Sequence, residues 1–446
     1  MNRQFTIKIG VILLLALMLM IPLTMIEDVV VERSNYRDQV RNDIAQSWTG
    51  SQMFLGPLLV APYQESVKAR VWDENLKAYH ETTVMENRKL YILPDELKIS
   101  GDIITEERKR GLYSIPVYAT DLAVRGSFGN GKIRELQQTK GTKIIWQQAY
   151  LTMMVSDVRG VSTQPMLIWN NSPYDFRPGS NIPEFEAGIH APLVKLAENK
   201  AEQYQFAFDI NLKGMESIEF SPAGKNTEVN IKANWPHPSF TGRYLPSHRE
   251  ITAEGFSAQW KMSSFSSDMP RLIKSCQKND CTGISGNTFG VALINTVDIY
   301  HKTERSVKYA ILFISLTFIT FFLFEIMKNL RLHPMQYLLV GLALTFFYLL
   351  LVSLSEHMAF AGAYLIASAA SVGIIGFYIS ALLQSRLRAG IFSGLLALLY
   401  IMLYAILVSE DNALLMGSLL FFTILSLVMT VTRKLDWYQV TEKLIK

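Results

Sequence analysis

The sequence predicts a membrane protein with six transmembrane α-helices, one N-terminal anchor plus a five-helix C-terminal bundle, and a large, mostly β exported domain. Three observations support this fold class. Residues 309–432 are almost continuously apolar, residues 28–308 are mixed and polar, and Lys and Arg gather at every second turn of the apolar part. Charged residues make up only 18% of the 446, and the mean hydropathy is +0.17. Such values are typical of a soluble part averaged with a membrane part.

The first expected helix covers residues 9–27 and follows a short N-terminal segment, residues 1–8, that carries Arg3 and Lys8. Its apolar run is close to the roughly 20 residues that span a bilayer. The run is longer than the usual core of a signal peptide, and no small-x-small cleavage site follows it. We therefore interpret the segment as an uncleaved anchor, with a cleaved signal peptide as the alternative.

Five further spans are expected in the apolar C-terminal part. The run from residue 337 to residue 383 is too long for one helix. Its only charged interruption is Glu356–His357, so we divide the run into two spans at this pair. The sequence Ser-Glu-Asp at 409–411 separates the last two spans. The expected order is therefore 309–327, the two halves of 337–383, then 390–408 and 412–432.

The distribution of Lys and Arg predicts the orientation of the spans. The N-terminus, the turns after the second and fourth spans, and the tail 433–446 are basic, whereas the turns after the third and fifth spans carry acidic residues. Both termini are therefore expected in the cytoplasm, with residues 28–308 outside. The basic residues concerned are Arg3, Lys8, Lys328, Arg331, Arg386, Arg388, Arg433, Lys434, Lys443 and Lys446.

The exported domain is expected to begin with a helix and continue as strands. Residues 29–48 have apolar side chains four residues apart, at Tyr36, Val40, Ile44 and Trp48, which predicts an amphipathic helix that continues out of the first span. Residues 204–214 and 227–235 alternate between apolar and polar side chains, as in antiparallel strands with one solvated face. We expect a mostly β domain that resembles a sandwich. Further expected strands lie at 88–94, 111–128, 143–155 and 289–300.

Motifs for catalysis or cofactor binding are missing from the sequence. It contains no G-x-S-x-G, H-E-x-x-H, P-loop or G-x-G-x-x-G pattern. The seven histidines are scattered without metal-ligand spacing. No basic stripe with interleaved aromatic residues indicates nucleic-acid binding. The sequence therefore predicts no enzyme activity, no cofactor, no metal site and no nucleic-acid partner.

Two stretches of the exported domain are candidate sites. In the stretch 235–246, the residues Trp235, His237, Phe240 and Tyr244 form either a packed corner of the β domain or a surface that binds a partner. The two cysteines of the chain, Cys276 and Cys281, would close a small disulfide loop in an oxidising compartment. Two free thiols in a loop are the alternative.

Ionisable residues near the spans need a physical reason, because a charge inside a bilayer is costly. Glu325 lies one turn before Lys328, so pairing or snorkelling explains it, and a polar cavity is the alternative. A further set of ionisable residues lies on two outer turns. These residues are either solvated, or they converge into an acidic patch. Such a patch would bind a cation, relay protons or contact the exported domain. The members of the set are Glu356, His357, Glu410 and Asp411.

Several unusual strings run through the chain from about residue 20 to residue 438. They include GPLLVAPY, VSDVRG, NWPHPSFTGRYLP, GFSAQW, LHPMQYLLVG, LVSLSEH and VTRKLDWY. In these strings the sequence resembles the CreD family of bacterial inner-membrane proteins, often labelled cell envelope integrity proteins. The resemblance implies a Gram-negative-type inner membrane, a large periplasmic domain and expression tied to envelope stress or a two-component system. It supplies no enzymatic reaction and no catalytic residues.

Three functional hypotheses follow. The first is a non-enzymatic inner-membrane protein that supports envelope integrity, with a periplasmic domain that binds or senses an envelope component. The lipid bilayer and an envelope protein or cell-wall component would then be its partners. The second is a transporter or channel built from the helical bundle. The third is a membrane enzyme that acts on lipid or cell-wall precursors through the outer acidic residues and His357.

Overall fold

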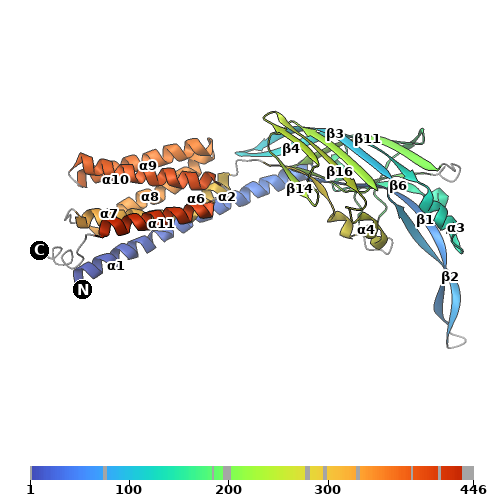
Figure 1. The fold of residues 1–446 in the computed structure, drawn as a ribbon, viewed down its shortest axis with the longest axis horizontal. Coiled ribbons are helices and arrows are strands. Elements are labelled where there is room, and N and C mark those ends of the chain that lie inside the picture. Colours follow the sequence, from blue (N-terminus) through green and yellow to red (C-terminus); the bar gives the residue numbers. More distant parts are fainter. Residues whose placement is uncertain are drawn as a thin grey trace. The chain divides into compact units, whose positions relative to one another are not determined.

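The chain divides into two compact units in a computed structural model. The structure describes residues 3–73, 78–182, 185–193, 202–276, 282–294, 299–327, 332–382, 385–409 and 413–433. The helical unit consists of Met1–Gln39 and Val297–Lys446, and the β unit consists of Val40–Thr296. Each unit has its own hydrophobic core. In chain order, the β unit is therefore an insertion into the helical unit (Figure 1).

The first sheet of the β unit has nine strands among the described residues. They are β1 (Gln52–Asp73), β2 (Ala78–Ile92), β5 (Thr142–Ile144), β6 (Tyr150–Val155), β9 (Arg177–Pro178), β10 (Ile189–Pro192), β12 (Ser217–Phe220), β14 (Pro238–Gly242) and β17 (Phe289–Leu293). Their order is β14-β17-β12-β1-β6-β10-β9, with β2 and β5 also paired to β1. Strand β1 is the centre of this sheet because four other strands pair with it.

The second sheet has eight strands within the same described ranges. They are β3 (Glu96–Arg110), β4 (Tyr113–Gly129), β7 (Met166–Trp169), β8 (Ser172–Asp175), β11 (Gln203–Met215), β13 (Asn226–Ala233), β15 (His248–Thr252) and β16 (Gly255–Ser263). Their order is β15-β16-β13-β3-β4-β11-β7-β8. Most neighbours are antiparallel, whereas β3–β13 here and β1–β12 in the first sheet are parallel.

Both sheets bury their apolar faces in one shared core. The alternation expected for 204–214 is confirmed, because the apolar side chains of β11 are buried while their neighbours face outward. Trp260 of β16 and Phe289 of β17 join the two sheets, with ring centroids 5.5 Å apart. A mostly β domain was expected, and two sheets around one core agree with this expectation.

Short helices interrupt the β unit where the sequence predicts strands or loops. Residues 289–300 were expected to be one strand, but β17 ends at Leu293 and helix α6 (Ile299–Lys308) follows. Tyr300, Thr303 and Val307 are buried at a spacing of three to four residues, which is the period of a helix. The other short helices are α3 (Gly131–Gln138), α4 (Met269–Cys276), α5 (Thr282–Ser285), η1 (Trp146–Gln148) and η2 (Val158–Gly160).

The helical unit contains long helices with apolar sequences. Helices α1 (Arg3–Met18) and α2 (Met20–Ser47) come first, and the boundary between the units falls within α2. The others are α7 (Ala310–Met327), α8 (Pro334–Ser355), α9 (Phe360–Leu382), α10 (Arg386–Val408) and α11 (Ala413–Thr432). His333 begins α8 with a capping box, and Pro334 occupies the first turn, where a missing N–H costs nothing.

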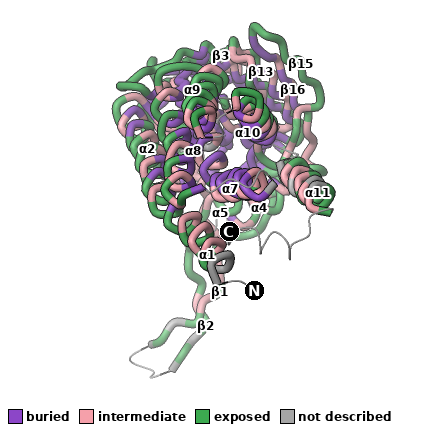
Figure 2. The backbone as a smooth tube through the Cα atoms, turned by 90° about the vertical axis from the view of Figure 1, so that its left-hand side faces the viewer, coloured by how far each residue is buried: buried purple, intermediate pink, exposed green. Residues whose placement is uncertain are grey.

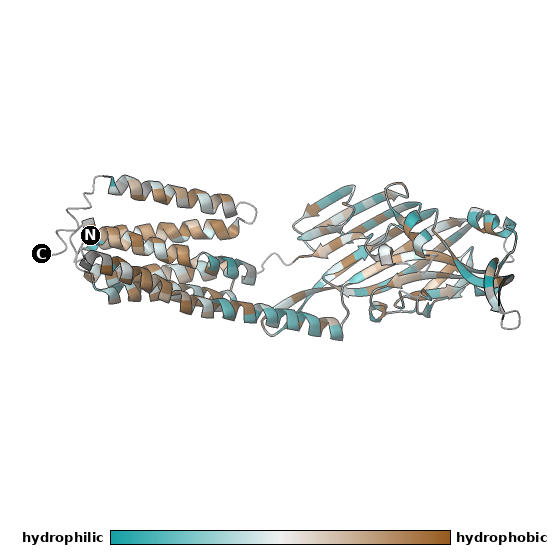
Figure 3. Cartoon of the chain, turned by 90° about the horizontal axis from the view of Figure 1, so that it is seen from below, coloured by the Kyte–Doolittle hydropathy of each residue, from teal (hydrophilic) through white to brown (hydrophobic). Residues whose placement is uncertain are grey.

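These helices are apolar on the outside as well as the inside. Figure 2 shows buried stretches on α7 and α8, whereas the described residues of α11 are intermediate or exposed. Figure 3 shows that the long helices of this unit are mostly hydrophobic along their length. Their outer side chains include Leu365 and Phe377 of α9, which are 69% and 80% exposed. A helix that is hydrophobic all round requires an apolar solvent when its outer face is not covered by protein. The helical unit therefore fits a lipid bilayer.

The expected count of six spans is not confirmed. Among the described residues, four helices are long and apolar enough to cross a membrane, in Ile7–Ser47, Pro334–Ser355, Phe360–Leu382 and Arg386–Val408. A fifth is reached if α6 and α7 form one span, which is bent by 43° at residue 309. The apolar segment Leu415–Thr430 of α11 is shorter than these. The bend before α7 is a feature that hydropathy alone does not reveal, and the span expected at 412–432 stays a prediction.

The amphipathic helix expected at 29–48 is the second half of α2. Val40 and Ile44 are 4% and 6% exposed, in agreement with the expected apolar face. Tyr36 was expected on that face but is 52% exposed. Within the β unit, the end of α2 is held by Arg41, whose guanidinium is paired with the carboxylate of Glu216 at 2.6 Å.

Replacing Trp260 with Ala should destabilise the β unit by about 3–5 kcal/mol, because the indole is fully buried between the sheets. Chemical unfolding of the full chain in detergent, followed by far-ultraviolet circular dichroism, measures this loss. Phe265→Ala is the control, since Phe265 is fully exposed. A similar loss for both variants would contradict the assignment of the core.

Candidate functional site

The outer acidic residues lie only partly within the described structure. Glu356 and His357 follow the last turn of α8, as the sequence predicts for a break between two helices. Glu410 and Asp411 lie outside the described residues. The expected convergence of these four side chains therefore stays a prediction.

Glu356 has partners that the sequence did not indicate. Its carboxylate accepts a hydrogen bond from the Tyr300 hydroxyl at 3.3 Å and lies 3.6 Å from Nε of Arg33. The Glu356 side chain is 10% exposed, so this contact replaces most of its water. His357 is exposed, and its Nδ1 lies 3.1 Å from the carbonyl oxygen of Ser353 in the preceding helical turn. Arg33 and Tyr300 come from α2 and α6, far away in sequence.

Glu325 is buried in the helical unit and has three hydrogen-bond donors. The side chain is 1% exposed and forms an ion pair with Lys8 of α1. The hydroxyl of Tyr337 donates to Oε2 at 2.9 Å, and the backbone N–H of Leu332 donates to Oε1 at 3.0 Å. Lys8 also donates to the carbonyl oxygen of Leu332 at 3.2 Å. We call Lys8, Glu325, Leu332 and Tyr337 the carboxylate cluster.

Pairing was expected for Glu325, with Lys328 as the expected partner. The structure pairs it with Lys8 instead, and Lys328 lies outside the described residues. A buried carboxylate with three donors is satisfied, and removal of one partner is costly because a charge is then left unpaired. The carboxylate cluster joins α1, α7 and α8, so its arrangement fits a structural connection between helices.

The aromatic stretch 235–246 packs largely against the core of the β unit. Phe240 lies in β14 and contacts the ring of Trp260, with centroids 5.8 Å apart. Nε1 of Trp235 donates to the carbonyl oxygen of Ile294, and the hydroxyl of Tyr244 donates to Oδ1 of Asn287 at 3.0 Å. His237 is exposed. These contacts agree with the packed-corner interpretation of three of the four residues.

The cysteine pair is only partly described. Cys276 is buried at the end of α4 and takes part in a disulfide bond. Cys281 lies outside the described residues, so the pairing expected from the sequence stays a prediction.

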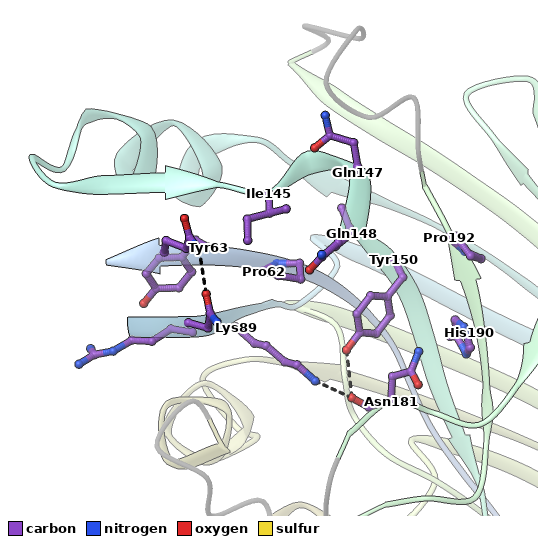
Figure 4. Close-up of a pocket in the computed structure, with 14 residues that line it drawn as sticks. Pro62, Tyr63, Lys89, Ile145, Gln147, Gln148, Tyr150, Asn181, His190 and Pro192 are labelled. Carbon is purple, nitrogen blue, oxygen red and sulfur yellow. Dashed lines mark hydrogen bonds between the residues drawn. The ribbon is translucent and has the colours of Figure 1, made fainter. Parts of the chain in front are cut away.

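The β unit also has a pocket that the sequence did not indicate, with a volume of about 650 Å³. It is lined by residues 62–64 of β1, 87–89 of β2, Ile145 and 147–150 around η1, Asn181, and His190 and Pro192 of β10. Figure 4 shows these side chains around one opening on the first sheet. We call it the β-sheet pocket. Its volume is typical of small-molecule sites, which range over roughly 300–1,000 Å³.

The carbonyl oxygen of Asn181 organises one wall of the β-sheet pocket. It accepts hydrogen bonds from Nζ of Lys89 at 2.8 Å and from the hydroxyl of Tyr150 at 3.1 Å (Figure 4). Burial lowers the pKa of Lys89 and raises the pKa of Tyr150, because each charged form is partly removed from water. Nδ1 of His190 lies 2.7 Å from the carbonyl oxygen of Gly179. Since a carbonyl only accepts, Nδ1 carries the proton, and Nε2 of the neutral ring is an acceptor.

Sequence reasoning missed this pocket because its lining comes from five separate segments without a shared motif. Asn181 carries the one local signal, a φ of +60° in the left-handed region that Asn tolerates better than most residues. Backbone conformation of this kind is not readable from one sequence.

The helices that are apolar on every side and the buried carboxylate cluster define a multi-pass membrane protein with a large β unit. Residues 4–438 match the family model described as Inner membrane protein CreD. The Inner membrane protein CreD of Escherichia coli (strain K12) is 36% identical over 425 residues, which cover 95% of this chain and 91% of the relative. The chain therefore belongs to the CreD family of inner membrane proteins, as the resemblance in its sequence indicated.

Removing the Glu325 carboxylate should destabilise the helical unit more than removing an exposed one. Glu325→Ala leaves Lys8 without its partner, at a cost of about 3 kcal/mol, and Tyr337→Phe removes one charge-assisted hydrogen bond, worth about 1.5–3 kcal/mol. Thermal unfolding of the full chain in mild detergent measures both losses.

Glu32→Ala is the matched control, because Glu32 is an exposed acid on α2. Equal stability of Glu325→Ala and Glu32→Ala would contradict the structural role of the carboxylate cluster. A Glu325→Gln variant that keeps its stability but loses biological activity would favour the transport hypothesis instead.

Proposed function

We propose that this protein is a non-enzymatic component of the bacterial inner membrane that supports the integrity of the cell envelope. In this proposal the β unit lies in the periplasm and binds or senses an envelope component, while the helical unit anchors it. The observation that carries the proposal is the β-sheet pocket, a polar opening of about 650 Å³ in the β unit. Polar groups that converge on one concave opening are the usual mark of a binding site.

The proposed orientation is supported by the distribution of charge along the chain. Basic residues flank the N-terminus, the start of α10 and the C-terminal tail, whereas Glu356 follows α8. Positively charged turns are retained in the cytoplasm. This distribution favours cytoplasmic termini and a periplasmic β unit.

Single cysteines test the orientation, in a background where Cys276 and Cys281 are replaced by Ser. Glu254→Cys, in the turn between β15 and β16, should react with a membrane-impermeable maleimide in intact cells that have a permeable outer membrane. Arg386→Cys, at the start of α10, should react only after the inner membrane is opened. The reverse pattern would contradict a periplasmic β unit.

Crosslinking tests the binding role. A photoreactive amino acid at Gln147, an exposed residue of the pocket lining, should form adducts in living cells. The same amino acid at Glu254, at the end of the second sheet opposite β8, is the control. The variant Gln147→Trp, which places a large ring at the pocket, should raise sensitivity to envelope stress in the same way as deletion of the protein. Absence of adducts together with full complementation by Gln147→Trp would contradict the proposal.

A further inference from the structure

The β-sheet pocket holds amide groups that the protein itself does not use. Within the described part of the chain, the side-chain amides of Gln147, Gln148 and Asn181 and the hydroxyl of Tyr63 make no hydrogen bond to another residue. A primary amide offers two donors beside an acceptor, and a hydroxyl offers one donor with acceptor lone pairs. With Nε2 of His190 as a further acceptor, the lining matches a ligand that is rich in hydroxyl and amide groups.

The pocket also holds one cation without a carboxylate partner. Arg88 is paired with Glu65 at 2.7 Å and with Glu86 at 3.0 Å, so its charge is compensated. Lys89 forms no ion pair with any described residue. Its ammonium group has three N–H donors, of which one is bound to the carbonyl oxygen of Asn181. Lys89 therefore has two donors and a full charge to offer to an anion.

The position of Lys89 is fixed by the fold. Asn181 adopts a φ of +60°, and its carbonyl oxygen binds both Lys89 and Tyr150. Nζ of Lys89 also lies 6.0 Å from the centre of the Tyr150 ring, within the range of a cation–π contact. The carbonyl oxygen of Asn181 therefore orients both the cation and the tyrosine on one wall of the pocket. Because Lys89 is half-buried, its interaction with an anion is less screened than at a surface.

A second hollow on the β unit, of about 510 Å³, is also lined by amides and cations, but several of its polar groups bind within the protein. The amide of Gln203 donates to the hydroxyl of Ser127 at 2.7 Å, and Oδ1 of Asn170 accepts from the backbone of Gln205. Of its two cations, Arg125 is paired with Asp209, whereas Lys98 forms no ion pair with a described residue. Several polar groups of the second hollow are therefore engaged, and its unpaired Lys98 is exposed, whereas Lys89 of the β-sheet pocket is half-buried.

We propose that the β-sheet pocket binds a short oligosaccharide that carries a carboxylate, with Lys89 on the carboxylate and the amides of Gln147 and Gln148 on hydroxyl and N-acetyl groups. This inference rests on the proposed function and specifies the ligand class of the same site. Hydroxyl-rich ligands suit the polar lining, and Tyr63 and Tyr150 supply aromatic rings with polar tips beside it. One uncompensated cation matches one carboxylate.

Binding to the purified full chain in detergent tests the inference. The probes are the disaccharide of N-acetylglucosamine and N-acetylmuramic acid, which has a carboxylate, and the neutral disaccharide of two N-acetylglucosamines. The acidic disaccharide should bind more tightly than the neutral one in isothermal titration calorimetry. Lys89→Met should weaken the acidic disaccharide about tenfold or more and leave the neutral one nearly unchanged.

Lys68→Met is the matched control, because Lys68 is an exposed lysine of β1 outside the pocket lining. Gln147→Ala, at an exposed position, tests the amide contribution without disturbing the core and should weaken both disaccharides. Absence of binding, or binding that Lys89→Met and Gln147→Ala leave unchanged, would overturn the oligosaccharide inference. If crosslinked adducts still form at Gln147 in cells, the β-sheet pocket binds an envelope component of another chemical class. Failure of the oligosaccharide inference is therefore distinguishable from failure of the proposed binding role.

Discussion

A carboxylate buried among apolar helices must be paired, and the helical unit of this protein is organised around that requirement. Glu325 is 1% exposed, and its donors come from α1, from the segment before α8 and from α8 itself. Lys8 lies 317 residues before Glu325, so the ion pair joins helix α1 to helix α7, on either side of the β unit in the sequence. The β unit can be inserted between them in sequence because this contact makes one folded unit of α1 and the C-terminal helices.

The two units place their apolar side chains differently. In the β unit, alternation along each strand puts apolar side chains into one core and polar ones outside, as in a water-soluble sandwich. In the helical unit, apolar side chains cover both the packed and the outer faces, and backbone groups are satisfied within the helices. Buried ionisable groups in that unit therefore need specific partners. The Glu325 and Glu356 contacts are two examples.

The sequence predicted elements that follow from local periodicity. The alternation of residues 204–214 identified the inner face of β11, and the apolar runs located the helices of the C-terminal part. Elements that depend on distant partners were missed or misassigned. Residues 299–300 looked like the end of a strand, but the burial of Tyr300 and Val307 makes them the start of α6.

Site residues were harder to predict than helices and strands, because their partners are distant in the sequence. Sequence reasoning marked Glu325 and Glu356 as polar residues that need an explanation, but Lys328 was the expected partner of Glu325 and Lys8 is the partner found. The partner Arg33 of Glu356 also lies hundreds of residues away. The β-sheet pocket depends on strand pairing that brings Lys89 beside Pro62 and Pro192 beside Tyr150. No single segment carries that information.

Hydrogen exchange on the full chain in inner-membrane vesicles tests most directly whether the β-sheet pocket is the binding site. Exchange is compared before and after addition of a soluble digest of the cell envelope. Binding at the pocket predicts slower exchange of the backbone amides in 145–150 and at residue 181, with β15 and β16 unchanged. Unchanged exchange at the pocket, or protection confined to another part of the β unit, would contradict this assignment.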